Sequence, residues 1–296
     1  MFTGRTDPAR NVAWPAVTVV NGSIATLLAQ ATGILGTDAA RLEAEILLAA
    51  CLDKPRSHLF AWPEREIEPR LQERFAALIS RRALGEPVAY LLGQREFWSL
   101  PLTVTPQTLI PRPETETLVA LALDTMPEDA PLCIADLGTG TGAIALAIAR
   151  ERPRSEVLAT DISPAALLVA RDNAARLGLD NVRFICGSWC RALTVDAFDF
   201  ILSNPPYVAE SDPHLRQGDL RFEPRKALAA GPRGLDALCR IISDAHDRLR
   251  TDGWLIVEHG CDQGEEVMQL MRTQGFRDIS DHTDNAGLSR VTRGRR

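Results

Sequence analysis

The chain has 296 residues, of which 45% are hydrophobic and 24% charged, so it has the composition of a globular protein and the length of about two domains. No apolar run is long enough to span a bilayer, residues 1–20 lack the apolar segment of a secretory signal, and the cysteines do not form a zinc-site pattern. With a net charge of −6, these features predict a cytoplasmic protein without a membrane anchor or a metal site, and they argue against direct nucleic-acid binding.

The first 86 residues are predicted to form a leader and a helical domain. Residues 1–20 are expected to be a flexible leader. In residues 21–86, Ser23 can cap a helix whose apolar residues Ile24, Leu27 and Leu28 recur at helical spacing, and similar patterns follow further along. No catalytic constellation occurs there, so we expect this small helical bundle to bind or position another molecule.

A change of pattern marks residues 87–108 as a linker. Residues 90–92 and 97–104 are apolar runs separated by Gly93-Gln94-Arg95-Glu96, which predicts a β-hairpin. The prolines of residues 109–116 then predict a rigid loop, and a helix is expected from Glu114 through Leu123.

Residues 109–296 form the second predicted domain, in which strands and helices alternate. Strands are predicted at 132–136, 156–160, 182–186, 198–203 and 254–258, and helices at about 143–152, 164–177, 233–250 and 263–273. Residues 276–291 are expected to add two antiparallel strands at the edge. The predicted fold class is therefore α/β, a doubly wound and mostly parallel seven-stranded sheet of the Rossmann-like kind.

Three glycines at alternate positions follow the first predicted strand of this domain. The segment Asp136-Leu137-Gly138-Thr139-Gly140-Thr141-Gly142 lets the backbone turn sharply and approach a ligand closely. Its spacing differs from the G-x-G-x-x-G of dinucleotide sites, and the carboxylate of Asp136 suits a ligand with an ammonium group, held directly or through water. Asp161 ends the next strand and can accept hydrogen bonds from both hydroxyls of a ribose.

An amino-acid end, a ribose and an adenine occur together in S-adenosylmethionine, and we predict this cofactor, with S-adenosylhomocysteine as its product. Trp189 follows the strand at 182–186 and is expected to cover the adenine with its indole. The alternatives are a glycine-rich turn with structural acids and a half-buried core tryptophan.

A second motif, Asn204-Pro205-Pro206-Tyr207, ends the apolar strand at 198–203. Two successive prolines make a stiff, extended turn. The Asn204 side-chain oxygen and the Pro205 carbonyl are two acceptors, and the Tyr207 ring is a flat face, so the motif suits a planar group that carries an NH2. Taken alone, the motif is equally an ordinary turn, because Asn and Pro are frequent turn residues.

Together the two motifs predict methyl transfer to a planar nitrogen. The sulfonium methyl is already activated, so neither a metal nor a covalent intermediate is needed. Asn204 and Pro205 are expected to accept both N–H bonds and to stabilise the charge that develops on the nitrogen, while Tyr207 holds the plane of the group. His214 and His259 are candidate proton acceptors by residue type only, and a structural or surface role is the alternative for both.

The sequence resembles a known family, the glutamine-N5 methyltransferases that modify peptide chain release factors (the HemK/PrmC family). The resemblance spans residues 21–293 and rests on residues 109–116, Asp136 to Gly142, Asp161, Ser203 to Tyr207, Arg221-Phe222-Glu223-Pro224 with Ala227-Leu228, and Glu258-His259-Gly260 with Gln263. The Asn-Pro-Pro-Tyr tetrapeptide also occurs in adenine-N6 DNA methyltransferases. Pro-Arg-Pro-Glu-Thr-Glu and Arg-Phe-Glu-Pro, combined with a helical N-terminal domain, are much more specific.

The resemblance implies a substrate, the glutamine of the Gly-Gly-Gln motif in class 1 peptide chain release factors. It implies that Gly138 to Gly142, Asp161, Trp189 and Asn204 line the cofactor pocket, that Asn204 to Tyr207 receive the glutamine, and that the helical domain docks on the release factor. One departure is Ser188, which stands where the family often has an acid that would accept from the adenine amine. We also hypothesise that Arg112 and Glu223 brace the loops over the substrate.

Two other functions stay open from the sequence. An adenine-N6 or guanine methyltransferase acting on nucleic acid would use the same socket with a flipped base on Tyr207, although the acidic balance and the small helical domain argue against it. A cofactor-binding protein without catalysis is the other alternative, and the intact Asn204-Pro205-Pro206-Tyr207 argues against that.

Overall fold

The structure, a computed structural model, describes residues 22–193 and 198–296, and the leader expected at residues 1–20 lies outside these ranges. The chain divides into two compact units, Met1–Leu92 and Gly93–Arg296. Each unit has hydrophobic core clusters of its own. Among the helices of the described ranges, none combines the length and the apolar character that crossing a membrane requires.

The first unit is helical, as predicted. It contains α1 (Ile24–Leu35), α2 (Ala40–Leu52), α3 (Arg56–Ala61), α4 (Pro69–Ala83) and α5 (Val88–Leu92). The Ser23 side chain caps α1 by accepting a hydrogen bond from the Thr26 N–H, and Gly36 ends the helix at a φ of 59°. The apolar faces of α1, α2 and α4 meet around Leu28, Leu47 and Phe75.

The hairpin that opens the second unit is shorter than predicted. β1 (Gln94–Phe97) pairs antiparallel with β2 (Leu100–Thr103), and Trp98 and Ser99 form the turn with positive φ angles of 50° and 56°. The strand expected at residues 90–92 is wrong, because these residues belong to helix α5. Val88, Leu91 and Leu92 have helical spacing and pack against the core of the first unit.

A seven-stranded sheet forms the centre of the second unit, as predicted, in the order β5-β4-β3-β6-β7-β9-β8. The five parallel strands are β3 (Cys133–Leu137), β4 (Glu156–Asp161), β5 (Val182–Cys186), β6 (Phe198–Ser203) and β7 (Leu249–Glu258). β8 (Arg277–Thr283) and β9 (Ser289–Arg295) complete the sheet in antiparallel pairing. The chain proceeds from β3 outward to β5 and then returns to β6 on the other side of β3. Ligand sites in such sheets lie beyond the carboxyl ends of the strands at this reversal.

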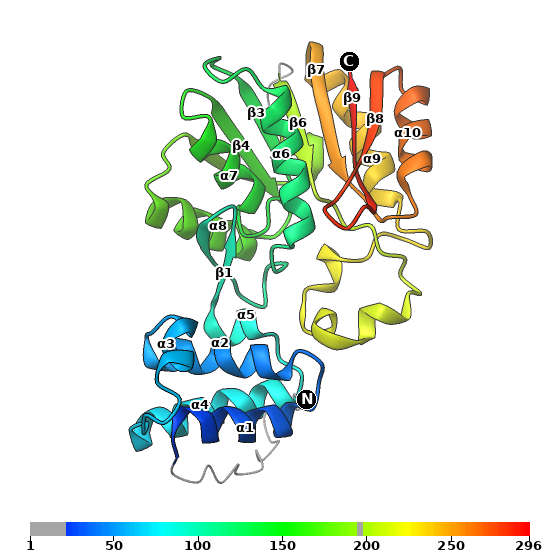
Figure 1. Ribbon diagram of the computed structural model, residues 1–296. Helices are drawn as coiled ribbons and strands as arrows, with labels where there is room; N and C mark the ends of the chain where they lie inside the picture. Colours follow the sequence, from blue (N-terminus) through cyan, green and yellow to red (C-terminus); the bar gives the residue numbers. More distant parts are fainter. Residues whose placement is uncertain (1–21, 194–197) are drawn as a thin grey trace, which may run out of the picture. The chain divides into compact units, whose positions relative to one another are not determined.

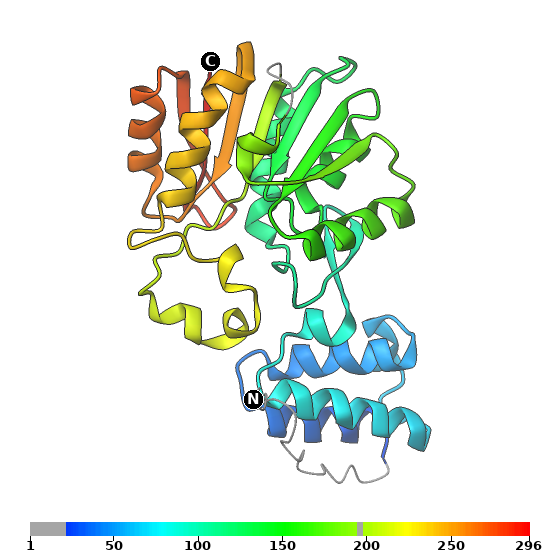
Figure 2. The same ribbon diagram turned by 180° about the vertical axis from the view of Figure 1, so that it is seen from behind.

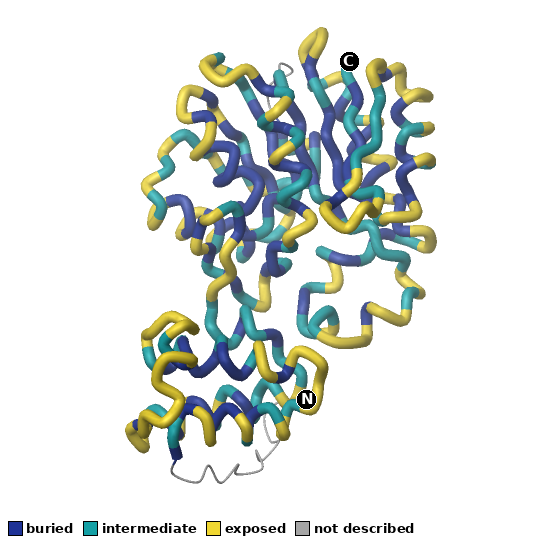
Figure 3. The backbone as a smooth tube through the Cα atoms, viewed as in Figure 1, coloured by how far each residue is buried: buried dark blue, intermediate teal, exposed yellow. Residues whose placement is uncertain are grey.

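Helices cover both faces of the sheet. α6 (Glu116–Thr125), α7 (Ala143–Glu151) and α8 (Pro164–Leu177) contribute to the core on one face, seen in Figure 1. α9 (Asp236–Arg248) and α10 (Gly264–Thr273) pack on the other, seen in Figure 2. Successive residues of a strand point to opposite faces of the sheet, so Ile134 packs in the core under α6 to α8 and Ala135 in the core under α9 and α10. The parallel strands are therefore buried on both sides, as the dark tube of Figure 3 shows.

Three predicted boundaries in this unit were wrong. The edge strands were expected to end at residue 291, whereas β9 continues to Arg295 and pairs there with β7 and β8. α9 begins at Asp236 rather than at residue 233, since Gly234 has a φ of 74° that a helix does not allow. β7 begins at Leu249 rather than at residue 254, because Leu249 already pairs with Phe198 across a register shift. None of these differences moves the carboxyl ends of the parallel strands, where the predicted site residues lie.

Candidate active site

A cavity of about 370 Å³ lies at the carboxyl ends of β3, β4 and β6. The sequence-predicted residues in its wall are Gly138, Gly140, Asp161, Trp189, Asn204 and Pro206. Residues 107–109 and 224–227 also line it, and the sequence had given these two segments no cofactor role. The volume falls in the range of small-molecule sites in proteins. The structure thus brings the glycine motif and the Asn-Pro-Pro-Tyr motif to one cavity.

The glycine turn lets the backbone form one wall of the cavity. Gly138 and Gly140 have φ angles of 76° and 56°, which side-chain-bearing residues rarely adopt. A Cβ added to Gly138 would lie 2.9 Å from Cζ3 of Trp189, so only glycine allows the indole to pack directly on the turn. Trp189 is itself held at a positive φ of 47° in the 3₁₀ turn Trp189–Ala192.

Asp161 connects the glycine turn to the cavity. Its Oδ2 accepts a hydrogen bond from the Gly140 N–H at 2.9 Å, and its Oδ1 accepts one from the Ser163 N–H at 2.8 Å. Each carboxylate oxygen has a further lone pair. Asp161 is therefore oriented by the backbone and can still accept from the two hydroxyls of a ribose.

Asp136 is fully buried and lies outside the described cavity wall. Its Oδ2 accepts from the Thr139 hydroxyl at 2.6 Å and from the Ala145 N–H at 3.2 Å, whereas its Oδ1 has no partner among the described residues. Burial raises the pKa of Asp136 to about 7, because the charged form loses its hydration. A buried carboxylate oxygen without a donor is costly. The ammonium group of S-adenosylmethionine has the opposite charge and could donate to this oxygen, directly or through water. This residue therefore fits the predicted cofactor.

Thr139, Thr141 and Gly142 shape the turn and are not part of the described cavity wall. Both threonine residues are buried, and the Thr141 carbonyl accepts from the Asn173 side chain at 2.9 Å. Gly142 has a φ of 86° and starts α7. Their contact with a cofactor stays a prediction, while their role in forming the turn is visible.

The Asn-Pro-Pro-Tyr motif presents alternate residues to the cavity. Asn204 and Pro206 line it, and Pro205 and Tyr207 do not appear in its described wall. The Asn204 Nδ2 donates a hydrogen bond to Thr115 Oγ1 at 2.9 Å. The side-chain oxygen is then the end of the amide that remains for another donor.

Tyr207 is fixed by Glu258, the last residue of β7. The Tyr207 hydroxyl donates to Glu258 Oε1 at 3.0 Å, and burial together with the nearby Glu258 charge raises the pKa of Tyr207. Glu258 itself is fully buried, and burial raises its pKa to about 7 although the neighbouring Thr115 and Tyr207 hydroxyls lower it. In the sequence, Thr115 and Glu258 stand out only as parts of longer motifs. The position of Glu258 at the carboxyl end of a parallel strand beside β6 was the signal for a role at the site.

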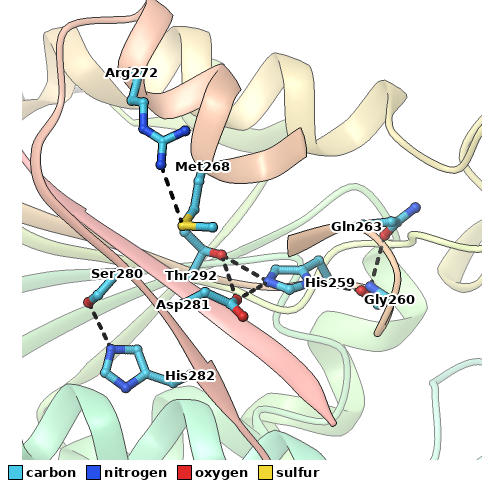
Figure 4. A network of polar contacts seen from close by, with 9 residues as sticks. All are labelled: His259, Gly260, Gln263, Met268, Arg272, Ser280, Asp281, His282 and Thr292. Carbon is cyan, nitrogen blue, oxygen red and sulfur yellow. Dashed lines mark hydrogen bonds and ion pairs between the residues drawn. The ribbon is translucent and has the colours of Figure 1, made fainter. Parts of the chain in front are cut away.

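His259 is buried and takes part in a support network rather than in the described cavity wall (Figure 4). Its Nε2 lies 3.0 Å from Asp281 Oδ1 and 2.9 Å from Thr292 Oγ1, and its Nδ1 lies 2.9 Å from the Gly260 carbonyl. Both ring nitrogens are engaged by neighbouring groups, which favours the structural role for this residue.

Gln263 extends this network to the Asn-Pro-Pro-Tyr motif. Its Oε1 accepts from the Gly260 N–H at 2.8 Å, and its Nε2 donates to the Tyr207 carbonyl at 3.1 Å. The other candidate histidine, His214, is exposed and lies 2.8 Å from Asp212 in a 3₁₀ turn. It is not part of the described cavity wall, so the surface role is favoured for it.

Arg112 and Glu223 form an ion pair between two loops that border the cavity. The Arg112 guanidinium contacts Glu223 Oε1, and Glu223 Oε2 accepts from the Ile110 N–H at 3.0 Å. Glu223 is buried, whereas the Arg112 side chain keeps 28% of its surface exposed. Both loops continue directly into the cavity-lining segments 107–109 and 224–227, which supports the hypothesis that the pair braces them.

Two family models match this chain. One, described as "PrmC N-terminal domain", matches residues 26–93, and the other, described as "Methyltransferase small domain", matches residues 116–219. Two solved structures share the fold over about two thirds to three quarters of this chain. A methyltransferase from Pyrococcus furiosus has a TM-score of 0.51 at 19% identity, covering 66% of this chain and 88% of its own. The catalytic domain of hMettl16 in complex with MAT2A 3'UTR hairpin 6 has a TM-score of 0.54 at 19% identity, covering 73% and 81%.

Curated relatives are much more similar in sequence. The release factor glutamine methyltransferase of Coxiella burnetii is 52% identical over 86% of this chain and 92% of its own length. The proteins of the same name from Vibrio cholerae and Pseudomonas aeruginosa are each 49% identical, over 88% and 86% of this chain and 91% and 92% of their own. Such identity over most of both chains is far above what a shared fold alone gives. The chain belongs to the family of release factor glutamine methyltransferases.

Proposed function

We infer that the protein transfers the methyl group of S-adenosylmethionine to N5, the side-chain amide nitrogen, of the glutamine in the Gly-Gly-Gln motif of class 1 peptide chain release factors. The observation that supports this most directly is the orientation of Asn204. Its NH2 is engaged by Thr115 at 2.9 Å, which leaves its oxygen for the N–H of an incoming amide at the cavity. An acceptor there suits a glutamine side chain, which offers two N–H donors on one nitrogen.

Five residues are proposed to hold the cofactor. Asp161 binds the ribose hydroxyls, Trp189 covers the adenine, and the backbone at Gly138 and Gly140 allows close approach to the ligand, since all four line the cavity. Asp136 attracts the amino-acid end through its unpartnered oxygen.

Ser188 also lines the cavity. Its hydroxyl can accept a hydrogen bond from the adenine amine.

The chemistry that the protein must support is a single substitution. S-adenosylmethionine supplies an electrophilic methyl group: the new C–N bond forms as the C–S bond breaks, and the sulfur keeps the electron pair of that bond. The glutamine nitrogen carries a developing positive charge and loses one proton afterwards.

Asn204 Oδ1 and the Pro205 carbonyl are proposed to accept its two N–H bonds, which aligns the nitrogen and stabilises that charge. The Tyr207 hydroxyl donates to Glu258 at 3.0 Å, and the Tyr207 ring is proposed to restrict the orientation of the plane of the substrate amide.

We propose that the helical unit docks on the body of the release factor. The match of residues 26–93 to the PrmC N-terminal model supports this, and curated relatives that cover most of this chain are named for the release factor. The six cysteine thiols are free, which supports the reducing cytoplasm as the compartment of the reaction.

Mass spectrometry of a digested release factor tests the proposal. After incubation with this protein and S-adenosylmethionine, the peptide containing Gly-Gly-Gln should gain the mass of one methyl group, located on the glutamine side chain. A matched factor with glutamate in that position should gain nothing. Methylation of another residue, or of adenine in added nucleic acid instead, would contradict the proposal.

A further inference from the structure

We propose that Asn173, a residue of α8, is a positioning residue for the cofactor, because its side chain connects the glycine turn after β3 with the hairpin of β1 and β2. Asn173 belongs to none of the sequence motifs that predict the site. It has no exposed surface, and a buried polar side chain is costly unless its hydrogen bonds are made. The inference rests on the proposed function, since it concerns the cavity in which the cofactor is proposed to lie.

Every hydrogen-bonding position of the Asn173 amide is used. Its Oδ1 accepts from the Thr103 N–H at 2.8 Å and from the Arg176 guanidinium at 2.6 Å. Its Nδ2 donates to the Thr103 carbonyl at 3.1 Å and to the Thr141 carbonyl at 2.9 Å. A side-chain amide has two lone pairs and two hydrogens for such bonds, so all four are paired. A flipped amide would oppose donor to donor and acceptor to acceptor, which fixes the orientation of the side chain.

The groups that Asn173 binds belong to two segments of the cavity. Thr141 follows Gly140 directly in the glycine turn, and Gly140 lines the cavity. Thr103 ends β2, and the chain continues from there into the cavity-lining segment 107–109. Both backbone groups of Thr103 are bonded to Asn173, so this one side chain holds the two segments together.

The conformation of the glycine turn depends on contacts from outside the turn. Gly138, Gly140 and Gly142 adopt positive φ angles of 76°, 56° and 86°, and glycine has the widest choice of backbone conformations. A bond that holds the Thr141 carbonyl restricts this choice before the cofactor binds, and preorganisation of a site increases its affinity. Asn173 is not part of the described cavity wall, so it acts on the cofactor only through the turn.

The connection also acts from the turn to the hairpin. A cofactor that orders the glycine turn should stabilise the bonds behind it, because the coupling between two sites is reciprocal. The Thr103 N–H, bonded to Asn173 at 2.8 Å, is therefore expected to open less often when the cofactor is bound. Thr103 is not part of the described cavity wall, so this effect distinguishes a connection through Asn173 from direct contact with the ligand.

Asn173→Asp separates the two arms of the connection. The carboxylate still accepts from the Thr103 N–H and pairs with the Arg176 guanidinium, but it cannot donate to the carbonyls of Thr103 and Thr141. We expect the Kd of S-adenosylmethionine, measured by calorimetry, to rise about tenfold. Hydrogen exchange of the Thr103 amide, followed by nuclear magnetic resonance, should slow on cofactor binding in the wild type and not in the variant.

Asn181→Asp is the matched control. The Asn181 side chain donates to the carbonyls of Ala149, Arg152 and Ser155 at 3.1, 3.4 and 3.1 Å, and it is not part of the described cavity wall. The same change of atoms therefore removes hydrogen bonds from this unit away from the cofactor turn. The Tm should fall as for Asn173→Asp, while the cofactor Kd should stay within about twofold of the wild-type value.

An unchanged cofactor Kd in Asn173→Asp would overturn the inference, and so would an equal rise in Asn181→Asp, which would indicate general destabilisation. Exchange at Thr103 that does not respond to the cofactor in the wild type would also overturn it. If Asn173→Asp does not fold, this wild-type measurement decides the question. A wild-type protein that binds no S-adenosylmethionine would refute the proposed function instead, so the two failures are distinct.

Discussion

Asn204 has a donor end and an acceptor end of nearly equal size, so its orientation decides what it can bind. In the structure the donor end is hydrogen-bonded to Thr115, and Asn204 lines the cavity. An amide of a substrate bound there keeps both of its N–H bonds paired while its nitrogen becomes positive. An oxygen acceptor at residue 204 is therefore the part of the side chain that the reaction needs.

Asn204→Ala should lower the kcat for release factor methylation by about 10²- to 10³-fold, which is the range for removing one preorganised hydrogen bond to a developing charge. The Kd of S-adenosylmethionine, measured by calorimetry, should change by less than about tenfold, because the cavity wall has other contributors. Asn285→Ala, an exposed asparagine in a turn, is the matched control and should behave as wild type. Equal kcat values for the two variants would contradict the assigned role.

At the scale of elements, the glycine turn after β3 is the most constrained segment of the site. Gly138→Ala places a Cβ at 2.9 Å from Trp189 and at a φ of 76°. We expect a loss of about 1–3 kcal/mol in the free energy of unfolding and weaker binding of S-adenosylmethionine, because the indole must move from the turn. Thermal denaturation with and without the cofactor measures both effects.

Gly33→Ala is the control for that substitution. Gly33 lies within α1, is exposed, and has no atom within 4 Å of an added Cβ. Alanine should therefore stabilise the helical unit by about 0.5–1 kcal/mol through its better helix propensity. Destabilisation by Gly33→Ala, or no effect of Gly138→Ala on either measurement, would contradict this account of the two positions.

The ion pair of Arg112 and Glu223 also acts at this scale, because it connects the two loops that border the cavity. Glu223→Ala removes the partner of Arg112 and leaves the buried Ile110 N–H unpaired, so we expect a loss of about 1–3 kcal/mol in stability and a clear decrease in kcat. The decrease should follow because both loops lead into the cavity wall. Turnover and urea denaturation are the measurements.

Glu266→Ala breaks another Arg–Glu pair, with Arg233, whose side chains are 70% and 39% exposed. This exposed pair should contribute less than about 1 kcal/mol, so Glu266→Ala should leave stability and turnover nearly unchanged. Unchanged turnover in Glu223→Ala would contradict the hypothesis that Arg112 and Glu223 brace the loops over the substrate.

The sequence predicted those features of the fold that depend on neighbouring residues. The strand and helix alternation, the sharp turn at Gly138 and Gly140, and the Ser23 cap each follow from local periodicity or from one residue type. Residues 90–92 were mistaken for a strand because three apolar residues in a row do not distinguish the two periods. The decisive partner, Val88, lies outside that run.

The hydrogen bonds behind the site could not be predicted in the same way. Thr115 and Asn204 are 89 positions apart, and Tyr207 and Glu258 are 51 apart. Their contacts exist only after β6 and β7 have paired and the loop before α6 has closed on them. The sequence motifs contain these residues but do not indicate which of their atoms form hydrogen bonds with each other.

At the scale of the whole molecule, the chain combines a unit that contains the described cavity with a helical unit that contributes no residue to its described wall. A separate docking unit acts by raising the effective concentration of the substrate loop at the site. We therefore expect residues 93–296 alone to methylate a short Gly-Gly-Gln peptide with a kcat/KM within about threefold of the full chain. The kcat/KM for the intact release factor should fall by about 10²-fold. An equal decrease for peptide and factor would indicate that the helical unit supports folding and not docking.

Transfer of a labelled methyl group from S-adenosylmethionine is the most direct test of the central claim. The acceptors are a native class 1 release factor, the same factor with its Gly-Gly-Gln glutamine replaced, and DNA and RNA, with the Asn204→Ala protein as the second enzyme. The account predicts label on the native factor alone, and only with the wild-type protein. Label on nucleic acid, or no label on any factor while the cofactor still binds, would contradict it.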